Sequence, residues 1–240
     1  MTALHLSRGS FKEEDTRTTN RETAAQSRPP RSISSLRVEP CEPATVAPFM
    51  IDRHYLHSMP KAPVVCFAVY DGSSLVGGSV FTQGARLSHT VLVAARPGDV
   101  LTLARFWLAD AVPKNAESRT LAYMLRWLRK HGSWKAVISF ADPGAGHVGT
   151  IYQASGWLFL GTTAAEPYIE LGDGRLHHPR SVYTRYGTNR VRHLTATGVP
   201  ARRVVTAPKF RYVFVLDPAW RWRLGKAVLP YPRGRGPPLS

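Results

Sequence analysis

The side chains with the clearest chemical potential gather in one stretch, SFADPGAGHVGTIYQASGW, over residues 139–157. The pattern predicts a buried strand, a Gly/Pro turn and a short helix. Asp142 ends the strand, His147 enters the helix, and Tyr152 lies about one and a half turns further in. Gly156 is expected to close the helix in a left-handed conformation. Junctions of this kind place reactive groups at the mouth of an α/β sheet, where ligand sites usually form.

Each of these residues has a chemical and a structural interpretation. A tyrosine hydroxyl, with an ordinary pKa of about 10, is better suited to protonating a thiolate than to accepting a proton at neutral pH. Tyr152 is therefore either a proton donor or a core aromatic residue. Asp142, directly before a proline, either forms the turn or orients an amine or a cation. His147 either caps the helix or contacts substrate, and the sequence does not choose between these roles.

Two further positions carry candidate chemistry. His54 and His57 are three residues apart on a helix predicted over 42–58, so they would share a face. Such a pair binds a metal when a carboxylate joins it, and otherwise is a surface feature. Arg105 lies in an otherwise mostly apolar strand predicted over 101–109, and if it points inward it needs an anion. Asp142, a phosphate and the substrate are the candidate partners.

The remaining elements predict a sheet that positions these groups. Asp71-Gly72 predicts a hairpin between two strands. A helix over 116–131 has Leu121, Met124, Leu125 and Leu128 on one face, and Asn115 or Ser118 is expected to cap it. The predicted strands cover 32–41, 63–70, 74–83, 101–109, 135–141, 158–171 and 179–186. This order predicts an α/β fold with a mixed, largely antiparallel twisted sheet flanked by helices.

Composition favours a polyanionic partner. The 240 residues carry a formal net charge of +16, with a pI near 10.5. Nucleic acid is the commonest partner of so basic a chain, although a solvated basic surface is an alternative. The two cysteines, Cys41 and Cys66, have no metal-ligand spacing and indicate a reducing compartment. Because no apolar run is long enough to span a membrane and no signal peptide is evident, we expect a cytoplasmic protein.

Three regions are expected along the chain: a disordered leader (1–31), a catalytic domain (32–187) and a basic, aromatic C-terminal extension (188–240). From residue 190 onward the chain has eleven Lys and Arg and a single acidic residue, Asp217. Basic side chains supply phosphate contacts, and interleaved aromatics can stack on bases. The run KFRYVFVL also fits an edge strand. The predicted DNA-contacting residues are Arg105, Lys209, Arg211, Arg221, Trp222 and Arg223.

The order of strands and helices over about 33–186 resembles the GNAT, or acyl-CoA N-acyltransferase, superfamily. The resemblance is sharpest in GTIYQASGW, residues 149–157, which is similar to the superfamily pattern of Tyr, a few residues, Gly and an aromatic. In that superfamily the tyrosine lies near the thiol end of coenzyme A and often protonates the departing thiolate. The resemblance implies that role for Tyr152.

A closer resemblance, over about 45–190, is to the bacteriophage Mom family of DNA-modification proteins. It rests on RFWLAD (105–110), KNAESR (114–119) and ADPGAGHVGTIYQASGW (141–157). It implies that a methylcarbamoyl-type group is placed on adenine N6 in phage DNA, which protects the DNA from host restriction. It also implies an acetyl-CoA-derived donor and raises iron as a second cofactor. The implied pocket residues are Tyr70, Ser118, Asp142 and Tyr152, and the implied metal ligands are His54 and Asp142.

The loop before the long helix departs from the acyltransferase pattern. It lacks the glycines with which that superfamily approaches the pyrophosphate, and Glu117 would repel phosphate. A helix N-terminus still offers free N–H groups to an anion. The expected cofactor-binding residues are Lys114, Asn115, Ala116, Ser118 and Arg119.

The sequence thus predicts a transferase that acts on double-stranded DNA with a flipped adenine, because N6 is buried in the duplex. Tyr70, Trp220 or Trp222 would hold the flipped base. Two alternatives stay open: an acetyl-CoA-dependent N-acetyltransferase for a protein or small amine, and a DNA-binding protein without activity. The oligomeric state is not predicted.

Overall fold

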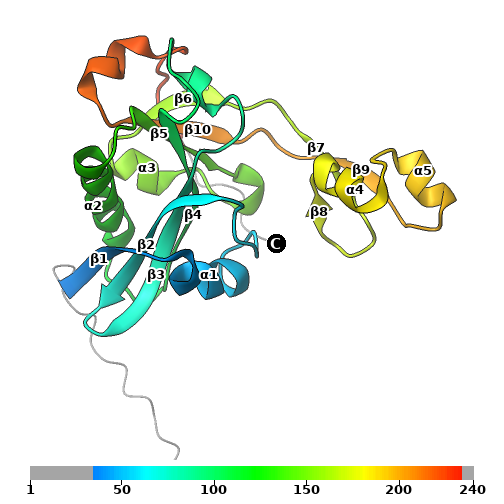
Figure 1. Ribbon diagram of the computed structural model, residues 1–240, viewed down its shortest axis with the longest axis horizontal. Helices are drawn as coiled ribbons and strands as arrows, with labels where there is room; N and C mark the ends of the chain where they lie inside the picture. Colours follow the sequence, from blue (N-terminus) through cyan, green and yellow to red (C-terminus); the bar gives the residue numbers. More distant parts are fainter. Residues whose placement is uncertain (1–34, 234–240) are drawn as a thin grey trace, which may run out of the picture.

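The computed structural model describes residues 35–233, which form a sheet domain and a smaller lobe beside it (Figure 1). The expected leader lies outside the described residues. The main sheet has seven strands in the order β1-β2-β3-β4-β5-β10-β6, and all neighbours are antiparallel except β4 and β5. The expectation of a mixed, largely antiparallel sheet flanked by helices is confirmed. Its strands are β1 (Leu36–Cys41), β2 (Pro63–Asp71), β3 (Ser74–Thr82), β4 (Val100–Leu108), β5 (Ala136–Ala141), β6 (Leu158–Thr162) and β10 (Phe210–Val215).

Helices cover both faces of this sheet because side chains alternate along its strands. On β2, Phe67 joins the core beneath α2 (Ala116–His131), whereas the next residue, Ala68, joins the core beneath α1 (Pro43–Asp52). The apolar face predicted for α2 is confirmed, since all four of its expected core residues are buried. The short helix α3 (Thr150–Ala154) packs beside α2. Shorter 3₁₀ helices lie at Ser88–Val91 (η2), Pro143–Ala145 (η3) and Pro218–Arg223 (η4).

Strand β10 brings the C-terminal part of the chain into the middle of the fold. It pairs with β5 on one side and β6 on the other, with Tyr212 and Val213 fully buried (Figure 1). The interpretation of KFRYVFVL as an edge strand is therefore wrong. Local patterning cannot distinguish the two cases, because a strand's neighbours are set by the path of the whole chain.

The lobe comprises residues 167–205 and has a small core of its own. Ile169, Leu171, Val182 and Leu194 are buried together there. The position expected to be the domain boundary, residue 187, falls inside this lobe, between its two helices. Its elements are β7 (Pro167–Glu170), β8 (Leu176–His177), α4 (Pro179–Tyr186), α5 (Val191–Ala196) and β9 (Arg202–Val205), with sheet order β8-β7-β9.

The strand predicted over 179–186 is wrong, because this segment is helix α4. The His178 side chain accepts a hydrogen bond from the Arg180 N–H, and Pro179 occupies the first helical position, where its missing N–H has no cost. Val182 and Tyr186 then lie four residues apart on the face toward the lobe core. The single strand predicted over 158–171 is divided into β6 and β7, which belong to different sheets.

The helix predicted over 42–58 ends at Asp52. The N–H groups of Arg53 and His54 both bond to the Phe49 carbonyl, which closes the helix, and His57 adopts a φ of 44°. His54 and His57 therefore do not share a helical face. Cys41 and Cys66 lie opposite each other on β1 and β2, and both are free thiols. Within residues 35–233, no helix has the length and apolarity needed to cross a membrane.

Candidate active site

A cavity of about 790 Å³ opens where β4 and β5 separate. These parallel strands pair only from Val100 to Thr102 on β4 and from Ala136 to Ile138 on β5. Beyond that point they diverge, and 103–108 and 139–142 form two walls of the cavity. The turn and helix start at 145–152 and the segment 53–55 complete it.

The floor of the cavity holds a chain of hydroxyl groups. Ser139 Oγ lies 2.8 Å from Tyr152 Oη and 3.1 Å from the Leu103 carbonyl oxygen. Ser139 has one hydroxyl proton, and a carbonyl oxygen can only accept. Both contacts are satisfied when Tyr152 donates to Ser139 and Ser139 donates to Leu103. These two hydrogen bonds therefore connect α3 to β5 and β4 at the point where the two strands separate.

Tyr152 is held in its protonated form. It is buried, with its ring 5.0 Å from that of Trp157 and 5.2 Å from that of Tyr212. Burial raises the pKa of Tyr152 to about 12. At neutral pH this hydroxyl can donate a proton but cannot serve as a base.

Tyr212 fixes the turn that leads into α3. Its hydroxyl donates to the Val148 carbonyl at 2.6 Å and accepts from Gln153 Nε2 at 3.0 Å. Gly149, with φ of 82°, stands directly over the Tyr212 ring and begins the helix. His147 therefore precedes the helix rather than entering it, which corrects the expectation for that residue. Gly156 has φ of 72°, as predicted for the end of this helix.

Asp142 stands at the mouth of the cavity, at the end of β5. Its Oδ1 accepts from the Gly144 N–H at 2.9 Å, so it does form the turn. Its Oδ2 lies 3.8 Å from Lys209 Nζ, just before β10. One carboxylate thus organises the turn and keeps a cation beside the opening.

Three aromatic rings cluster in the cavity lining. The Tyr55 ring lies 4.6 Å from the His54 ring and 5.3 Å from the His147 ring. Burial raises the pKa of Tyr55, with a smaller contribution from Asp142, while Arg105 lowers it. Neither Ser139 nor Tyr55 was predicted to be a site residue. A serine within a buried strand and a tyrosine at helical spacing both match ordinary core patterns.

Arg105 lies in the cavity wall, and within residues 35–233 its hydrogen bonds go to a serine and to backbone carbonyls. Its Nε and Nη2 donate to the backbone oxygen and Oγ of Ser58 at 2.9 and 3.1 Å, and its Nη1 donates to the Ala104 carbonyl at 2.7 Å. Asp142 is not its partner. Burial lowers the pKa of Arg105, and Tyr55 opposes that shift.

The residues present do not fit a resident iron. His54 Nδ1 accepts a hydrogen bond from the Leu56 N–H at 3.1 Å, so the proton of the neutral ring resides on Nε2. Nδ1 is occupied by the hydrogen bond and Nε2 by the proton, so neither nitrogen has a lone pair free for a metal. Burial, and next the charge of Arg105, lower the pKa of His54 to about 4. Among the described residues, no three His, Cys, Asp or Glu side chains group as a metal site. His54 and Asp142 therefore lack a third donor.

The other expected pocket residues lie elsewhere. Tyr70 packs in the core beneath α1, under the Arg37 guanidinium at 4.8 Å, and does not line the cavity. At the start of α2 neither expected cap forms: Asn115 is left-handed and makes no side-chain cap bond, and Ser118 Oγ donates to the Asn115 carbonyl at 3.1 Å. Glu117, rather than any of the expected cofactor-binding residues (Lys114, Asn115, Ala116, Ser118 and Arg119), reaches the cavity.

The expected DNA contacts are divided between two ends of the sheet. Lys209 lies at the cavity mouth, and Arg211 lies on β10 opposite Phe140. Arg221, Trp222 and Arg223 belong to η4, which packs near the start of β5, where Trp220 meets Lys135 at 5.8 Å. That is the end of the sheet away from the cavity mouth, so Trp220 and Trp222 do not face the cavity.

Solved structures similar to this chain include bacterial acetyltransferases. A ribosomal-protein-S5-alanine acetyltransferase from Vibrio fischeri is 11% identical, covering 78% of this chain and 96% of its own, with a TM-score of 0.45. A Bacillus subtilis acetyltransferase solved with CoA is 12% identical, covering 75% of this chain and 98% of its own, with a TM-score of 0.42.

The comparison in sequence is more specific. The chain is 31% identical over 208 residues to the methylcarbamoylase mom of Escherichia phage Mu, which covers 82% of this chain and 84% of that protein. The sequence pattern of the Mom protein family matches residues 35–233, all of the part that the structure describes. The chain therefore belongs to the Mom protein family.

Proposed function

We propose that this protein is a transferase that modifies adenine in DNA, moving an acyl-type group onto the exocyclic N6 amine. The observation that carries the proposal is the Tyr152–Ser139 hydroxyl chain at the cavity floor, with Asp142 at its mouth. The relative from phage Mu, a methylcarbamoylase by name, supports the same reaction class.

The separation of β4 and β5 suits an acyl-CoA-type donor. Such a donor supplies an acyl group activated as a thioester. Beyond Thr102 and Ile138 the strands no longer pair with each other, so their facing edges offer backbone groups to an extended, amide-containing arm. The N-terminus of α2 has free backbone N–H groups, which favour an anionic part of the donor such as a phosphate. The carboxylate of Glu117, in the first turn of α2, would repel that anion.

Tyr152 and Ser139 act on the leaving group. Release of a thiol from a thioester needs a proton, and Tyr152 holds one at Oη with a pKa of about 12. The 2.8 Å contact with Ser139 fixes the position of that hydroxyl at the cavity floor, from which its proton would turn to the departing sulfur. Ser139 is thus a positioning residue and Tyr152 the general acid.

The mouth receives the nucleobase. Adenine N6 lies within the duplex stack, so its modification needs base flipping, at a few kcal/mol. Tyr55 and His147 lie together in the cavity lining, with their ring centroids 5.3 Å apart, and offer an aromatic surface on which a flipped base can stack. Asp142 can accept a hydrogen bond from N6 and take its proton as the new bond forms. These residues replace Tyr70, Trp220 and Trp222 in that role.

The name of the phage Mu relative supports an inference about the transferred group. We infer a methylcarbamoyl-type product, in line with that name, and we propose that the modification protects phage DNA from host restriction. No step is assigned to iron, because His54 and Asp142 do not provide a suitable set of donors.

The test is mass spectrometry of nucleosides from the DNA of cells that express the protein. We expect a deoxyadenosine species heavier than the parent in the wild type and none with Tyr152→Phe. Tyr123→Phe, an exposed tyrosine on α2, is the matched control and should behave as wild type. If the soluble wild-type protein yields no new nucleoside, DNA is not the substrate, and an N-acetyltransferase for another amine takes its place.

A further inference from the structure

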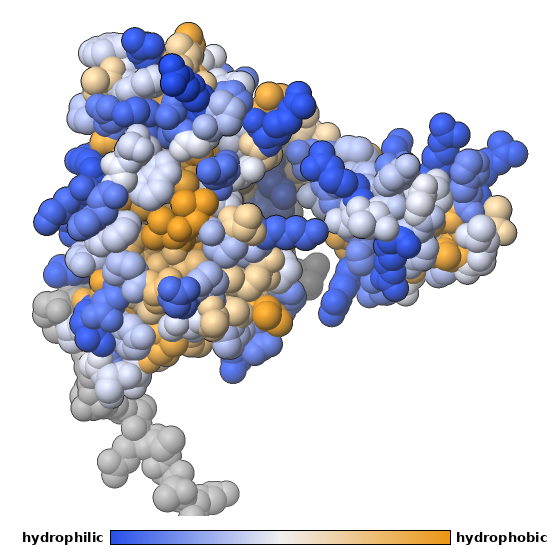
Figure 2. All heavy atoms as spheres, in the orientation of Figure 1, coloured by the Kyte–Doolittle hydropathy of each residue, from blue (hydrophilic) through white to orange (hydrophobic). Residues whose placement is uncertain are grey.

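The lobe differs from the sheet domain in the kind and balance of its charges. Residues 167–205 contain seven arginines, no lysine and two acidic residues, Glu170 and Asp173. Residues 35–166 contain twelve Lys and Arg and nine acidic residues. The positive charge of the lobe is therefore carried by guanidinium groups, with no lysine among them. Figure 2 shows hydrophilic residues over much of its visible face.

Both acidic residues of the lobe are already engaged. Glu170 Oε2 accepts from Arg202 Nε at 3.0 Å, and Asp173 Oδ2 lies 2.7 Å from His177 Nε2. The other six arginines are exposed and form no ion pair with any described acidic side chain; they are Arg175, Arg180, Arg185, Arg190, Arg192 and Arg203. Like charges gathered without counter-charges lower the stability of a small fold unless an anion binds them.

These arginines are not needed to build the lobe. Its core is apolar, with Val182 and Leu194 each 1% exposed. A two-stranded neck joins it to the sheet domain, through the Thr163 N–H to the Lys209 carbonyl at 2.8 Å and the Thr206 N–H to the Glu166 carbonyl at 2.9 Å. The arginines can therefore be changed without loss of the fold.

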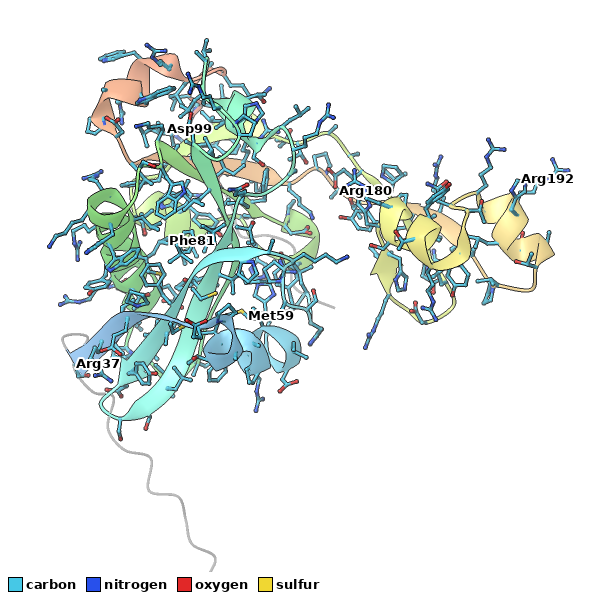
Figure 3. All side chains as sticks on the ribbon, viewed as in Figure 1. Arg37, Met59, Phe81, Asp99, Arg180 and Arg192 are labelled. Carbon is cyan, nitrogen blue, oxygen red and sulfur yellow. The ribbon has the colours of Figure 1, made fainter. Side chains whose placement is uncertain are left out.

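The neck starts at the cavity mouth. Lys209, at its base, faces Asp142 at 3.8 Å. From there the arginines extend along the lobe: Figure 3 shows Arg180 on the side nearest the sheet domain and Arg192 at the far end. A long polyanion with one unit in the cavity would therefore run along the lobe.

We propose that the arginine-rich lobe holds the sugar-phosphate backbone of the DNA duplex that flanks the nucleotide in the cavity. This inference rests on the proposed function for its choice of polyanion. Arginine suits the task because its planar guanidinium binds phosphate oxygens in pairs. Backbone contacts hold and orient a duplex without reading its sequence.

The experiment compares two matched sets of substitutions. The lobe set is Arg180→Gln with Arg185→Gln and Arg192→Gln. The control set, at the other end of the sheet, is Arg221→Gln with Arg223→Gln and Lys226→Gln, which removes the same charge. Binding of a short labelled duplex is measured by fluorescence anisotropy over a range of salt concentrations.

We expect the lobe set to weaken binding at least tenfold and to reduce the slope of log K against log salt by about 0.9 per lost phosphate contact. The control set should retain the wild-type affinity and slope. Arginine-to-lysine substitutions at the same three lobe positions should restore most of the slope, because they keep the charge. Circular dichroism checks that each variant folds.

Wild-type affinity and slope in the lobe set would overturn the inference, as would an equal loss in the control set. Binding of polyglutamate in preference to duplex would replace DNA with an acidic protein partner. A different result would contradict the proposed function alone. If the wild-type protein binds duplex through the lobe but yields no modified nucleoside, the role of the lobe stands and the proposed reaction is wrong.

Discussion

The cavity and the lobe satisfy their polar groups in opposite ways. At the cavity floor, Tyr152 and Ser139 are buried and hydrogen-bonded to each other, and Ser139 also donates to the Leu103 carbonyl. In the lobe, six arginines face solvent and have no acidic partner within residues 35–233. A buried network acts over one or two bonds and is sensitive to single atoms, whereas exposed charges act over about 10 Å and are screened by salt. Chemistry and substrate capture should therefore be separable by substitution.

The largest expected effect comes from the cavity floor. Tyr152→Phe removes the proposed general acid and should lower the rate of adenine modification by about 100-fold or more. Duplex affinity should stay at the wild-type value, because Tyr152 is buried away from the lobe. Single-turnover modification and anisotropy measure the two quantities. A parallel loss of affinity would show that the two regions are not independent.

A smaller loss is expected at the mouth. Asp142→Asn keeps the oxygen that accepts the Gly144 N–H but loses the charge beside Lys209. We expect modification to fall roughly 10- to 100-fold, as for removal of a general base, with duplex affinity unchanged or slightly higher. The control is Asp173→Asn in the lobe, which should leave the reaction rate at the wild-type value. Equal rates in the two variants would remove Asp142 from the mechanism.

Packing gives a third contrast between the regions. At Gly149 (φ 82°), a Cβ would lie 2.4 Å from the Tyr212 ring, whereas at Gly174 in the lobe (φ 71°) it would meet nothing within 4 Å. Gly174→Ala should lower the free energy of unfolding by about 1 kcal/mol, the cost of a left-handed alanine. Gly149→Ala should lower it by about 1–3 kcal/mol more, because the ring must move. Urea denaturation compares them, and equal losses would mean that the turn accommodates a methyl group.

The last contrast concerns pH. The pKa of His54 is about 4 in the folded protein and 6.5 when unperturbed, so the unfolded chain takes up the proton first. Stability should therefore fall as pH drops from about 6.5 to about 4, and His54→Asn should flatten that dependence. An unchanged pH dependence in His54→Asn would show that this histidine does not cause it. Urea denaturation at several pH values measures it.

Strong local patterns in the sequence predicted part of the cavity lining. The Gly-rich turn after a buried strand predicted that Asp142 and Tyr152 would lie near the mouth of a sheet; both line the cavity, Asp142 at its mouth and Tyr152 at its floor. Residues that act only through distant partners were not predictable. Ser139 has a role because Leu103 and Tyr152 reach it from other elements, and Tyr55 because its segment turns back over the cavity.

By itself the sequence determined the amphipathic face of α2, the β2–β3 hairpin, the order of most strands and the strongly basic character of the chain. These depend on residue type and periodicity, which are local. Only the tertiary structure decided that β10 lies between β5 and β6, that 167–205 form a separate lobe, and that β4 and β5 part to make the cavity. Each of these is a contact between segments far apart in the chain, and no short window of sequence specifies which distant strand will be its neighbour.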